Sequence, residues 1–248
     1  MRPLLKWTSS LLAVTTMAAC AQTSPGRAPV PPVTPSTAKP PAQSAPQPPL
    51  DPAVAAMVAQ GIARLDAFKT VQGQVIFDEF KDGDTDHGKA QIYFRNKPFA
   101  GRVEMLESDR WLATGGVILW SGGTQLKIKP LKMPFSLTFP IDHSQTVSMR
   151  GYRLDQTDLF SMAKVLRAPG AQIRPLGPRR MRGEDLFLLE VRSPASVPGV
   201  AHEVIGLHQR HLIPTYREMY DARGQLVHRG QGVKLTFDRP LDGELFQL

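Results

Sequence analysis

Residues 88–95 read GKAQIYFR, and this stretch decides the fold. The apolar residues Ala90, Ile92 and Phe94 alternate with residues that are polar or that end in a polar group. Because successive side chains of a β-strand point to opposite faces of a sheet, this alternation places one apolar row on one face. We therefore predict a strand that is buried on one face only, as in antiparallel sheets.

The same period of two recurs on both sides of this stretch. Four further strands are marked by alternating apolar positions, at Val75 and Phe77, Val103 and Met105, Leu126 and Ile128, and Phe135, Leu137 and Phe139. Five more are predicted at residues 185–191, 202–208, 213–220, 225–230 and 233–237. Turn signals such as Ala222-Arg223-Gly224 separate these later segments. The chain is therefore expected to form about ten antiparallel strands.

A helix is predicted ahead of the strands, at residues 51–68. Its larger apolar residues are spaced three and four apart, which forms a single apolar stripe. Asp51 followed by Pro52 suits an N-cap and the first helical position. The stripe consists of Val54, Met57, Val58, Ile62, Leu65 and Phe68.

A second helix is predicted at residues 157–170, between the two groups of strands. Thr157 is expected to cap it, and Pro169 with Gly170 is expected to end it. Its apolar face consists of Leu159, Met162, Ala163 and Leu166. The predicted fold class is therefore mainly β (α+β), an antiparallel sheet whose apolar face is covered by two helices.

The front of the chain has the layout of a secretion signal at residues 1–19. Arg2 and Lys6 precede an uncharged run, residues 8–19, that ends in two small residues. A helix of that length spans about 18 Å, well short of the hydrocarbon core of about 30 Å. We therefore predict a cleaved signal peptide and not a permanent membrane span.

The cleavage site indicates a lipid anchor. Residues 17–20, MAAC, resemble the bacterial lipobox, with Met17 where Leu is commoner, and Cys20 is the one cysteine of the chain. The resemblance implies that Cys20 is diacylated on sulfur, becomes the new N-terminus and is acylated there too. Two or more acyl chains hold a protein stably on a membrane. The alternative is an ordinary buried or free thiol; in either case a single cysteine allows no intrachain disulfide.

Residues 20–50 are predicted to be a tether between the anchor and the folded part. Residues 24–49 contain ten prolines and no aromatic residue, so this segment cannot bury a core. As polyproline II, at about 3.1 Å per residue, it would span about 80 Å. Residues 51–248 remain to fold, which suits one domain.

The charge of the chain gives no indication of nucleic-acid binding. The formal net charge of +8 falls to +4 when the signal and the tether are set aside, because these contain four basic residues and no acidic one. The folded part has no Lys/Arg block with interleaved aromatic residues. Anionic lipid head groups are a simpler explanation for a mild positive charge.

Residues 82–88, DGDTDHG, carry aspartates at alternating positions and could suggest a calcium loop. An EF-hand loop requires Gly at its sixth position and Glu at its twelfth. Those positions are His87 and Tyr93 here. We therefore predict a polar hairpin turn.

No metal site and no catalytic site is predicted. His202, His208 and His211 have no nearby cysteine and no helical pair four residues apart, so a surface position is favoured. The sequence has no G-x-S-x-G motif, and the segments SMRGY and HSQT offer Ser and His without a recognisable scaffold. We expect neither an enzyme nor a cofactor.

Several segments together resemble the LolA/LolB outer-membrane lipoprotein carriers. In order and spacing, residues 64–80, 88–98 and 117–130 are similar to the N-terminal half of that family, and residues 159–167, 183–191 and 212–227 are similar to its central helix and later strands. The ordered set covers most of residues 60–238. The matching positions are Gly88, Ile92, Tyr93, Phe94, Lys97 and Pro98, then Gly122, Gly123, Thr124 and Leu126.

The resemblance implies an open antiparallel β-barrel, or half-barrel, closed by helices around an apolar cavity that receives acyl chains of lipoproteins. The predicted anchor is a feature of the LolB-type acceptor and not of the soluble carrier. The chain also differs from the family at Lys97, because the family commonly has Arg before this proline. Arg95 lies two residues earlier, so no specific arginine contact is carried over.

The functional prediction is a lipid-anchored protein of a Gram-negative envelope, at the outer membrane and facing the periplasm, that binds acyl chains for transfer or sorting. The alternative is an envelope sensor or scaffold that binds a protein partner with the same fold. A closed, packed barrel would show the same alternation along its strands, and only the resemblance favours an open cavity. The candidate cavity residues are Val75, Phe77, Ile92, Phe94, Val103, Met105, Leu126, Ile128, Leu159, Met162 and Leu166.

Overall fold

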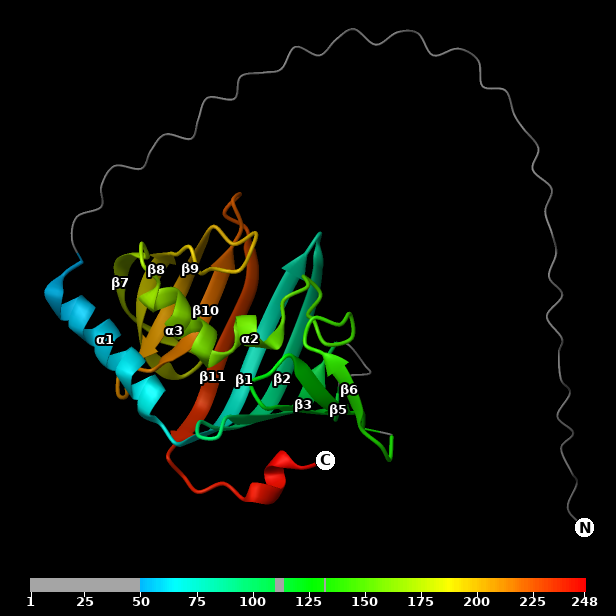
Figure 1. The fold of residues 1–248 in the computed structure, drawn as a ribbon. Coiled ribbons are helices and arrows are strands. Elements are labelled where there is room, and N and C mark those ends of the chain that lie inside the picture. The colour runs from blue at the N-terminus through cyan, green and yellow to red at the C-terminus, as the bar shows by residue number, and fades with distance from the viewer. Residues whose placement is uncertain (1–49, 110–113, 132) are drawn as a thin grey trace, which may run out of the picture. The chain divides into compact units, whose positions relative to one another are not determined.

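The computed structural model describes residues 50–109, 114–131 and 133–248 (Figure 1). The predicted signal, Cys20 and most of the tether lie outside the described residues. A single eleven-stranded sheet has the order β6-β5-β4-β3-β2-β1-β11-β10-β9-β8-β7, and the neighbouring strands are antiparallel. Strands β6 and β7 form the two edges. The predicted open antiparallel half-barrel covered by helices is therefore confirmed.

The elements follow the chain in two groups of strands with helices before each group. They are α1 (Pro52–Ala67), β1 (Thr70–Lys81), β2 (Asp84–Arg95), β3 (Ala100–Ser108), β4 (Val117–Trp120), β5 (Gln125–Lys129), β6 (Leu137–Pro140), α2 (Leu154–Thr157), α3 (Leu159–Arg167), β7 (Gln172–Met181), β8 (Glu184–Arg192), β9 (His202–His208), β10 (Pro214–Tyr220), β11 (Leu226–Phe237) and the 3₁₀ helix η1 (Gly243–Phe246). Among these described elements, no helix is both long and apolar enough to cross a membrane.

Strand β1 lies at the centre of the sheet and joins the two groups. It pairs with β2 along its full length, and its other edge pairs with β11, the last strand of the chain. The turn between β1 and β2 is Asp82-Gly83, where both residues have positive φ. This is the backbone of a tight two-residue hairpin. The remaining residues of the predicted polar turn belong to β2.

Helix α1 begins and packs as predicted. The Asp51 side chain accepts a hydrogen bond from the Ala53 N–H at 2.7 Å, and Pro52 is the first helical residue. Val54, Val58 and Leu65 of the predicted stripe are buried. The helix therefore places its apolar stripe against the core.

The second predicted helix is two helices, and its cap was predicted one residue too early. Thr157 ends the short helix α2, and Asp158 is the N-cap of α3, because its side chain accepts a hydrogen bond from the Ser161 N–H at 2.7 Å. A carboxylate is at least as good an N-cap as a hydroxyl, and here only Asp158 has the required extended backbone. The predicted apolar face of α3 is buried throughout.

The main core lies between the helices and the concave face of the sheet. Figure 1 shows α2 and α3 lying across this face, with α1 beside them. Leu65, Val71, Leu189 and Ile205 are among its completely buried side chains. Burying one such side chain contributes about 1.5–3 kcal/mol. The helices are therefore fixed on the sheet by apolar contact.

The predicted strands differ from the observed ones at four places, the last of which is the segment around Phe135. Strand β7 was missed because Pro175, Gly177 and Pro178 interrupt the alternation at an edge that is largely exposed. Strand β4, VILW, was not predicted from alternation, because it is a continuous apolar run. The segments predicted at 225–230 and 233–237 are one strand, β11, because its backbone pairing with β1 continues through Gly230 and Gly232.

The segment around Phe135 is not a half-buried strand. Strand β6 begins only at Leu137, and Phe135 is 53% exposed. This segment lies at the edge of the sheet, where Leu137 is also exposed. The alternation at residues 135–139 therefore does not correspond to burial.

Candidate functional site

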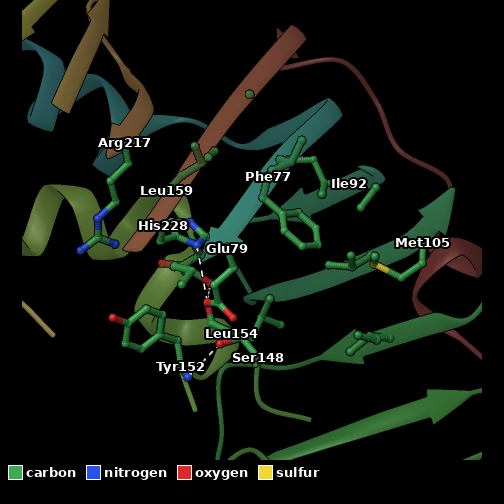
Figure 2. A pocket seen from close by; sticks show the side chains of 18 of the residues that line it. Phe77, Glu79, Ile92, Met105, Ser148, Tyr152, Leu154, Leu159, Arg217 and His228 are labelled. Atoms are coloured by element: carbon green, nitrogen blue, oxygen red, sulfur yellow. Dashed lines mark hydrogen bonds and ion pairs between the residues drawn. The ribbon is translucent and has the colours of Figure 1, made fainter. Parts of the chain in front are cut away.

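A cavity of about 260 Å³ lies between the concave face of the sheet, from β5 through β1 to β11 and β10, and the covering segment formed by α2, α3 and residues 145–152. Figure 2 shows side chains from both layers pointing into it. Ligand pockets in proteins commonly measure about 300–1,000 Å³, so this cavity is at the small end. We take it as the candidate functional site.

Nine of the eleven candidate cavity residues lie on its wall. They are Val75, Phe77, Ile92, Phe94, Val103, Met105, Leu126, Leu159 and Met162. The other two lie elsewhere: Ile128 packs on the cluster of Trp120, Leu126 and Ile141, and Leu166 is buried in the main core. Ile128 is too far out on the sheet, and Leu166 is one turn of α3 beyond Met162. Ligand contact by the nine remains a prediction.

The wall residues differ in how tightly they are held. Phe94 is 4% exposed, and its ring lies 6.1 Å from that of Phe99 and 6.2 Å from that of Phe160. Val75 and Met105, by contrast, are only partly buried and pack at the margin of the core. Phe94 therefore belongs to the packed aromatic floor, whereas Val75 and Met105 face the hollow.

Gly88 makes room for an aromatic side chain of the wall. A Cβ atom on Gly88 would lie 2.1 Å from the Phe77 ring, which is far closer than real atoms approach. The two residues are directly paired between β1 and β2. The position of the Phe77 ring, and with it the width of the cavity, therefore depends on this glycine.

One end of the cavity is polar. Along β1 the inward side chains change from Val75 through Phe77 to Glu79, and Glu79 pairs directly with Asp86 on β2 and with His228 on β11. Figure 2 shows Glu79 and His228 close to Ser148 and Tyr152, with Phe77, Ile92 and Met105 on the other side. The cavity therefore has an apolar part and a polar end, which follow from the register of the sheet.

Glu79 anchors the loop that closes the polar end. Its Oε2 atom accepts a hydrogen bond from the Arg150 N–H at 3.0 Å, and its Oε1 atom lies 3.8 Å from His228 Nδ1. The Ser148 hydroxyl oxygen accepts from the Tyr152 N–H at 3.0 Å. Burial acts to raise the pKa of Glu79, but the interactions with His228, Ser148 and the Arg150 N–H outweigh it, so its pKa is lowered. Glu79 is therefore ionised at neutral pH.

Arg217 connects the sheet to the helices at the same end. Its Nε donates to Glu203 Oε2 at 2.6 Å, and its Nη1 donates to the Ser161 hydroxyl at 2.9 Å and to the Gln156 carbonyl at 2.7 Å. The Arg217 side chain is 2% exposed. Breaking such a buried pair costs about 3–5 kcal/mol. Arg217 therefore fixes α2 and α3 over the cavity.

Asp158 lies on the wall near Arg217. Burial raises the pKa of Asp158 to about 6, against the opposing effects of its hydrogen bonds with Ser161 and of the charge of Arg217. Part of its surface faces the cavity. The protonation of this carboxyl group therefore changes in a mildly acidic range.

None of the residues of the polar end was predicted from the sequence. Its residues lie at inward positions that continue the strand alternation, with Glu79 on β1, His228 on β11 and Arg217 on β10. Charged residues at inward positions of a strand were the available signal. Alternation alone does not say which set of side chains faces the helices, so this signal was not enough to identify them.

The three histidines do not converge on one point. The rings of His208 and His211 stack at 4.0 Å, whereas His202 stacks on Tyr220 at 4.7 Å. Within the described part of the chain, no group of three or more His, Cys, Asp or Glu side chains is arranged to hold a metal ion. Burial lowers the pKa of His211 to about 4, so it is neutral at physiological pH.

The large apolar side chains that are exposed among the described residues lie in one region of the chain. They are Leu106, Leu131, Met133, Phe135 and Leu137. All belong to β3 or to the β5–β6 hairpin and its connection. Lys127 and Lys129 of β5 are also accessible there, and residues 125–141 contain no Asp or Glu. We refer to the five apolar residues as the exposed apolar group.

Comparison with known proteins gives structural likeness without sequence similarity. No family model and no curated protein matches the chain. An uncharacterised conserved protein from Thermus thermophilus is similar in structure, with 12% identity over 79% of this chain and 94% of that protein and a TM-score of 0.50.

Two further solved structures are similar at lower scores. The lipoprotein LppX from Mycobacterium tuberculosis has 15% identity over 78% of this chain and 99% of LppX, with a TM-score of 0.48. A LolA superfamily protein from Nitrosomonas europaea has 13% identity over 78% of this chain and 97% of that protein, with a TM-score of 0.38. At these identities the likeness concerns the fold alone, which in this chain is an open antiparallel sheet covered by helices.

Proposed function

We propose that this protein is a lipid-anchored component of a Gram-negative cell envelope that holds an acyl chain of a lipoprotein or lipid during transfer or sorting. The observation that supports the proposal is the cavity, whose wall consists mainly of apolar side chains from the sheet and α3. Met105 and Met162 on this wall suit chains of varied shape, because methionine is flexible and polarisable. The function requires no covalent step.

The expected gain in free energy is sufficient for binding. Burial of each acyl CH₂ contributes about 0.8 kcal/mol, so a ten-carbon portion contributes about 8 kcal/mol before the entropic cost of binding. A cavity near the lower limit for ligand sites suits one chain, so a cargo with several chains would require the helices to move.

The proposed location rests on the sequence. Cys20 is proposed to carry the acyl chains that anchor the protein, and the proline-rich tether gives the domain reach into the periplasm. Ala21 follows Cys20, and the absence of Asp at this position points to the outer membrane by the sorting rule of enteric bacteria. Finding the protein in the inner membrane would contradict this assignment.

The test uses the compact unit Pro46–Leu248, which contains the whole sheet and its apolar clusters. A unit of this size buries enough surface to fold alone, and a cooperative unfolding transition is the control for that. We expect it to bind a fluorescent fatty-acyl probe and to co-purify with lipids or acylated peptides that mass spectrometry identifies. Failure of the folded unit to bind any acyl probe or lipopeptide would overturn the proposal.

The second candidate function is an envelope sensor or scaffold that binds a protein partner. The exposed apolar group favours it, because apolar patches on a protein surface often mark interaction sites. Phe135→Ser separates the two functions, because Phe135 does not line the cavity. Loss of a cross-linked envelope partner with unchanged probe binding would support the scaffold function.

A further inference from the structure

The polar end of the cavity contains buried polar atoms without hydrogen-bond partners among the described residues. Glu79, Thr215 and Arg217 are each 2% exposed and His228 is 6% exposed. Within the described part of the chain, Thr215 Oγ1 and Arg217 Nη2 have no hydrogen-bond partner, and Glu79 Oε1 and His228 Nδ1 face each other at 3.8 Å, which is longer than a hydrogen bond. All four residues line the same cavity. Buried polar atoms in native proteins nearly always have partners, so this end is suited to a ligand with polar atoms of its own.

These atoms require both kinds of hydrogen-bonding group from a ligand. Arg217 Nη2 can only donate, so it requires an acceptor such as a carbonyl oxygen. Glu79 Oε1 belongs to an ionised carboxylate and lies 3.8 Å from His228 Nδ1, so it can still accept a hydrogen bond from an N–H or O–H donor of a ligand. The Thr215 hydroxyl can serve either kind. An amide, or an ester with a free hydroxyl group, offers both.

The charges at this end disfavour a free fatty acid. Glu79, Asp86 and Asp158 line the cavity, and Glu203 lies beside it. Among the described lining residues Arg217 is the permanent cation, and it is already paired with Glu203. The other basic groups near this end are also engaged, because His228 faces Glu79 and the Arg150 side chain donates to the Phe80 carbonyl. An entering carboxylate would therefore be desolvated beside several acidic groups with little compensation.

We infer that the polar end is a head-group site for a single acyl chain joined to a neutral amide or glyceryl ester. This inference rests on the proposed function, since it names the ligand class of the same cavity. The chain lies along Val75, Phe77 and Met105, and the head group lies between Glu79 and Arg217. The amide would come from an N-acylated lipoprotein terminus, and the ester from a monoacyl glycerolipid.

The experiment measures displacement of the fluorescent probe from the Pro46–Leu248 unit at pH 7 by ligands that share one lauroyl chain. These are lauramide, an N-lauroyl dipeptide amide, monolaurin and lauric acid. We expect the neutral ligands to bind about tenfold more tightly than lauric acid, as expected for one hydrogen bond to a charged group. Tighter binding of the dipeptide amide than of monolaurin would identify the lipoprotein source. Tighter binding of monolaurin would identify the glycerolipid source.

Glu79→Gln tests the assignment of the polar end. The glutamine oxygen can keep the hydrogen bond with the Arg150 N–H, while its amide nitrogen replaces the acceptor Oε1 with a donor. We expect the variant to lose affinity for lauramide and to gain affinity for lauric acid. Met105→Ala is the matched control at the apolar part, and it should lower the affinity for all four ligands by the same factor.

Two results would overturn the inference. The first is binding of lauric acid as tight as that of the neutral ligands. The second is a Glu79→Gln variant that shifts all four affinities by one factor, as a purely structural residue would. In both cases the probe still binds, so the proposed function survives. Absence of probe binding to the folded wild-type unit would instead overturn the proposed function itself.

Discussion

Single side chains distinguish a packed core from a vacant pocket at this site. Phe94 is 4% exposed and lies in an aromatic cluster, whereas Met105 is partly exposed toward the cavity. We expect Phe94→Ala to lower the free energy of unfolding by about 3–5 kcal/mol and Met105→Ala by less than about 2 kcal/mol. Urea unfolding of the two variants measures this. Equal losses would show that Met105 is packed as tightly as Phe94.

The contact of Gly88 with Phe77 predicts that one methyl group narrows the cavity. Gly88→Ala would force the Phe77 ring to move, because the new Cβ would overlap it. Overpacking lowers the free energy of unfolding by about 1–3 kcal/mol. Because the displaced ring would occupy part of the cavity, we also expect acyl-probe affinity to fall about tenfold, which is about 1.4 kcal/mol. Gly123→Ala is the matched control, because a Cβ there meets nothing within 4 Å. An unchanged affinity for Gly88→Ala would exclude the Phe77 ring from the binding surface.

The raised pKa of Asp158 predicts that the free energy of unfolding depends on pH. Its pKa of about 6 in the folded protein exceeds the usual value of 3.8, so between these values the folded state binds more protons than the unfolded chain. Stability therefore falls as the pH rises through this window. Asp158→Asn keeps an N-cap but has no group that titrates in this window, so its stability does not decline there. The difference in the free energy of unfolding between wild type and Asp158→Asn therefore changes by at most about 3 kcal/mol, and the change is complete above pH 6.

Urea unfolding of wild type and Asp158→Asn at a series of pH values tests this prediction. His211, whose lowered pKa of about 4 makes stability fall as the pH drops from about 6.5, acts in the opposite direction. Its contribution is the same in both proteins, so it cancels in their difference. A difference that does not change with pH would contradict the assignment to Asp158.

At the scale of elements, α3 forms one wall of the cavity. We expect a substitution to glutamate to have different effects on binding at its buried face and at its exposed face. Met162 is 4% exposed and lines the cavity, whereas Lys164 on the same helix is exposed. We expect Met162→Glu to abolish binding of the acyl probe, because it places a charge in an apolar wall. Lys164→Glu, the control, should leave binding unchanged. A folded Met162→Glu variant with wild-type affinity would remove α3 from the site.

The elements that sequence patterns predicted are those with one buried and one exposed face. The alternation of Ala90, Ile92 and Phe94 identified β2, because only half of that strand meets the core. Strand β7 has no such contrast, since it lies at an edge and contains Pro175 and Pro178. In β11, glycine replaces the apolar residues that would have joined its two halves.

The apolar part of the site was predictable for the same reason, and the polar end was not. Val75 and Phe77 belong to one alternating row, and so does Glu79 two residues later. Glu79 and His228 lie far apart in the sequence, and the pairing of the first and last strands brings them together. No local pattern reports that pairing.

For the whole molecule, the sequence predicts that the anchor and the domain are independent. Cys20 lies outside the described residues, and the compact unit begins at Pro46. We expect Cys20→Ser to leave the chain unprocessed or released from membranes while the domain remains folded. Membrane fractionation, with protease resistance as the measure of folding, tests this. A mature, lipidated membrane protein from the mutant gene would contradict the lipobox prediction.

The two free edges of the open sheet matter when many copies of the protein lie close together. Lipid-anchored molecules crowd on one surface, and strands with free edges tend to join into fibrils under such conditions. Proline lacks an N–H group, and Pro175 and Pro178 interrupt the edge of β7, while β6 is only four residues long and ends at Pro140. The sheet can thus keep two free edges without polymerising with its neighbours.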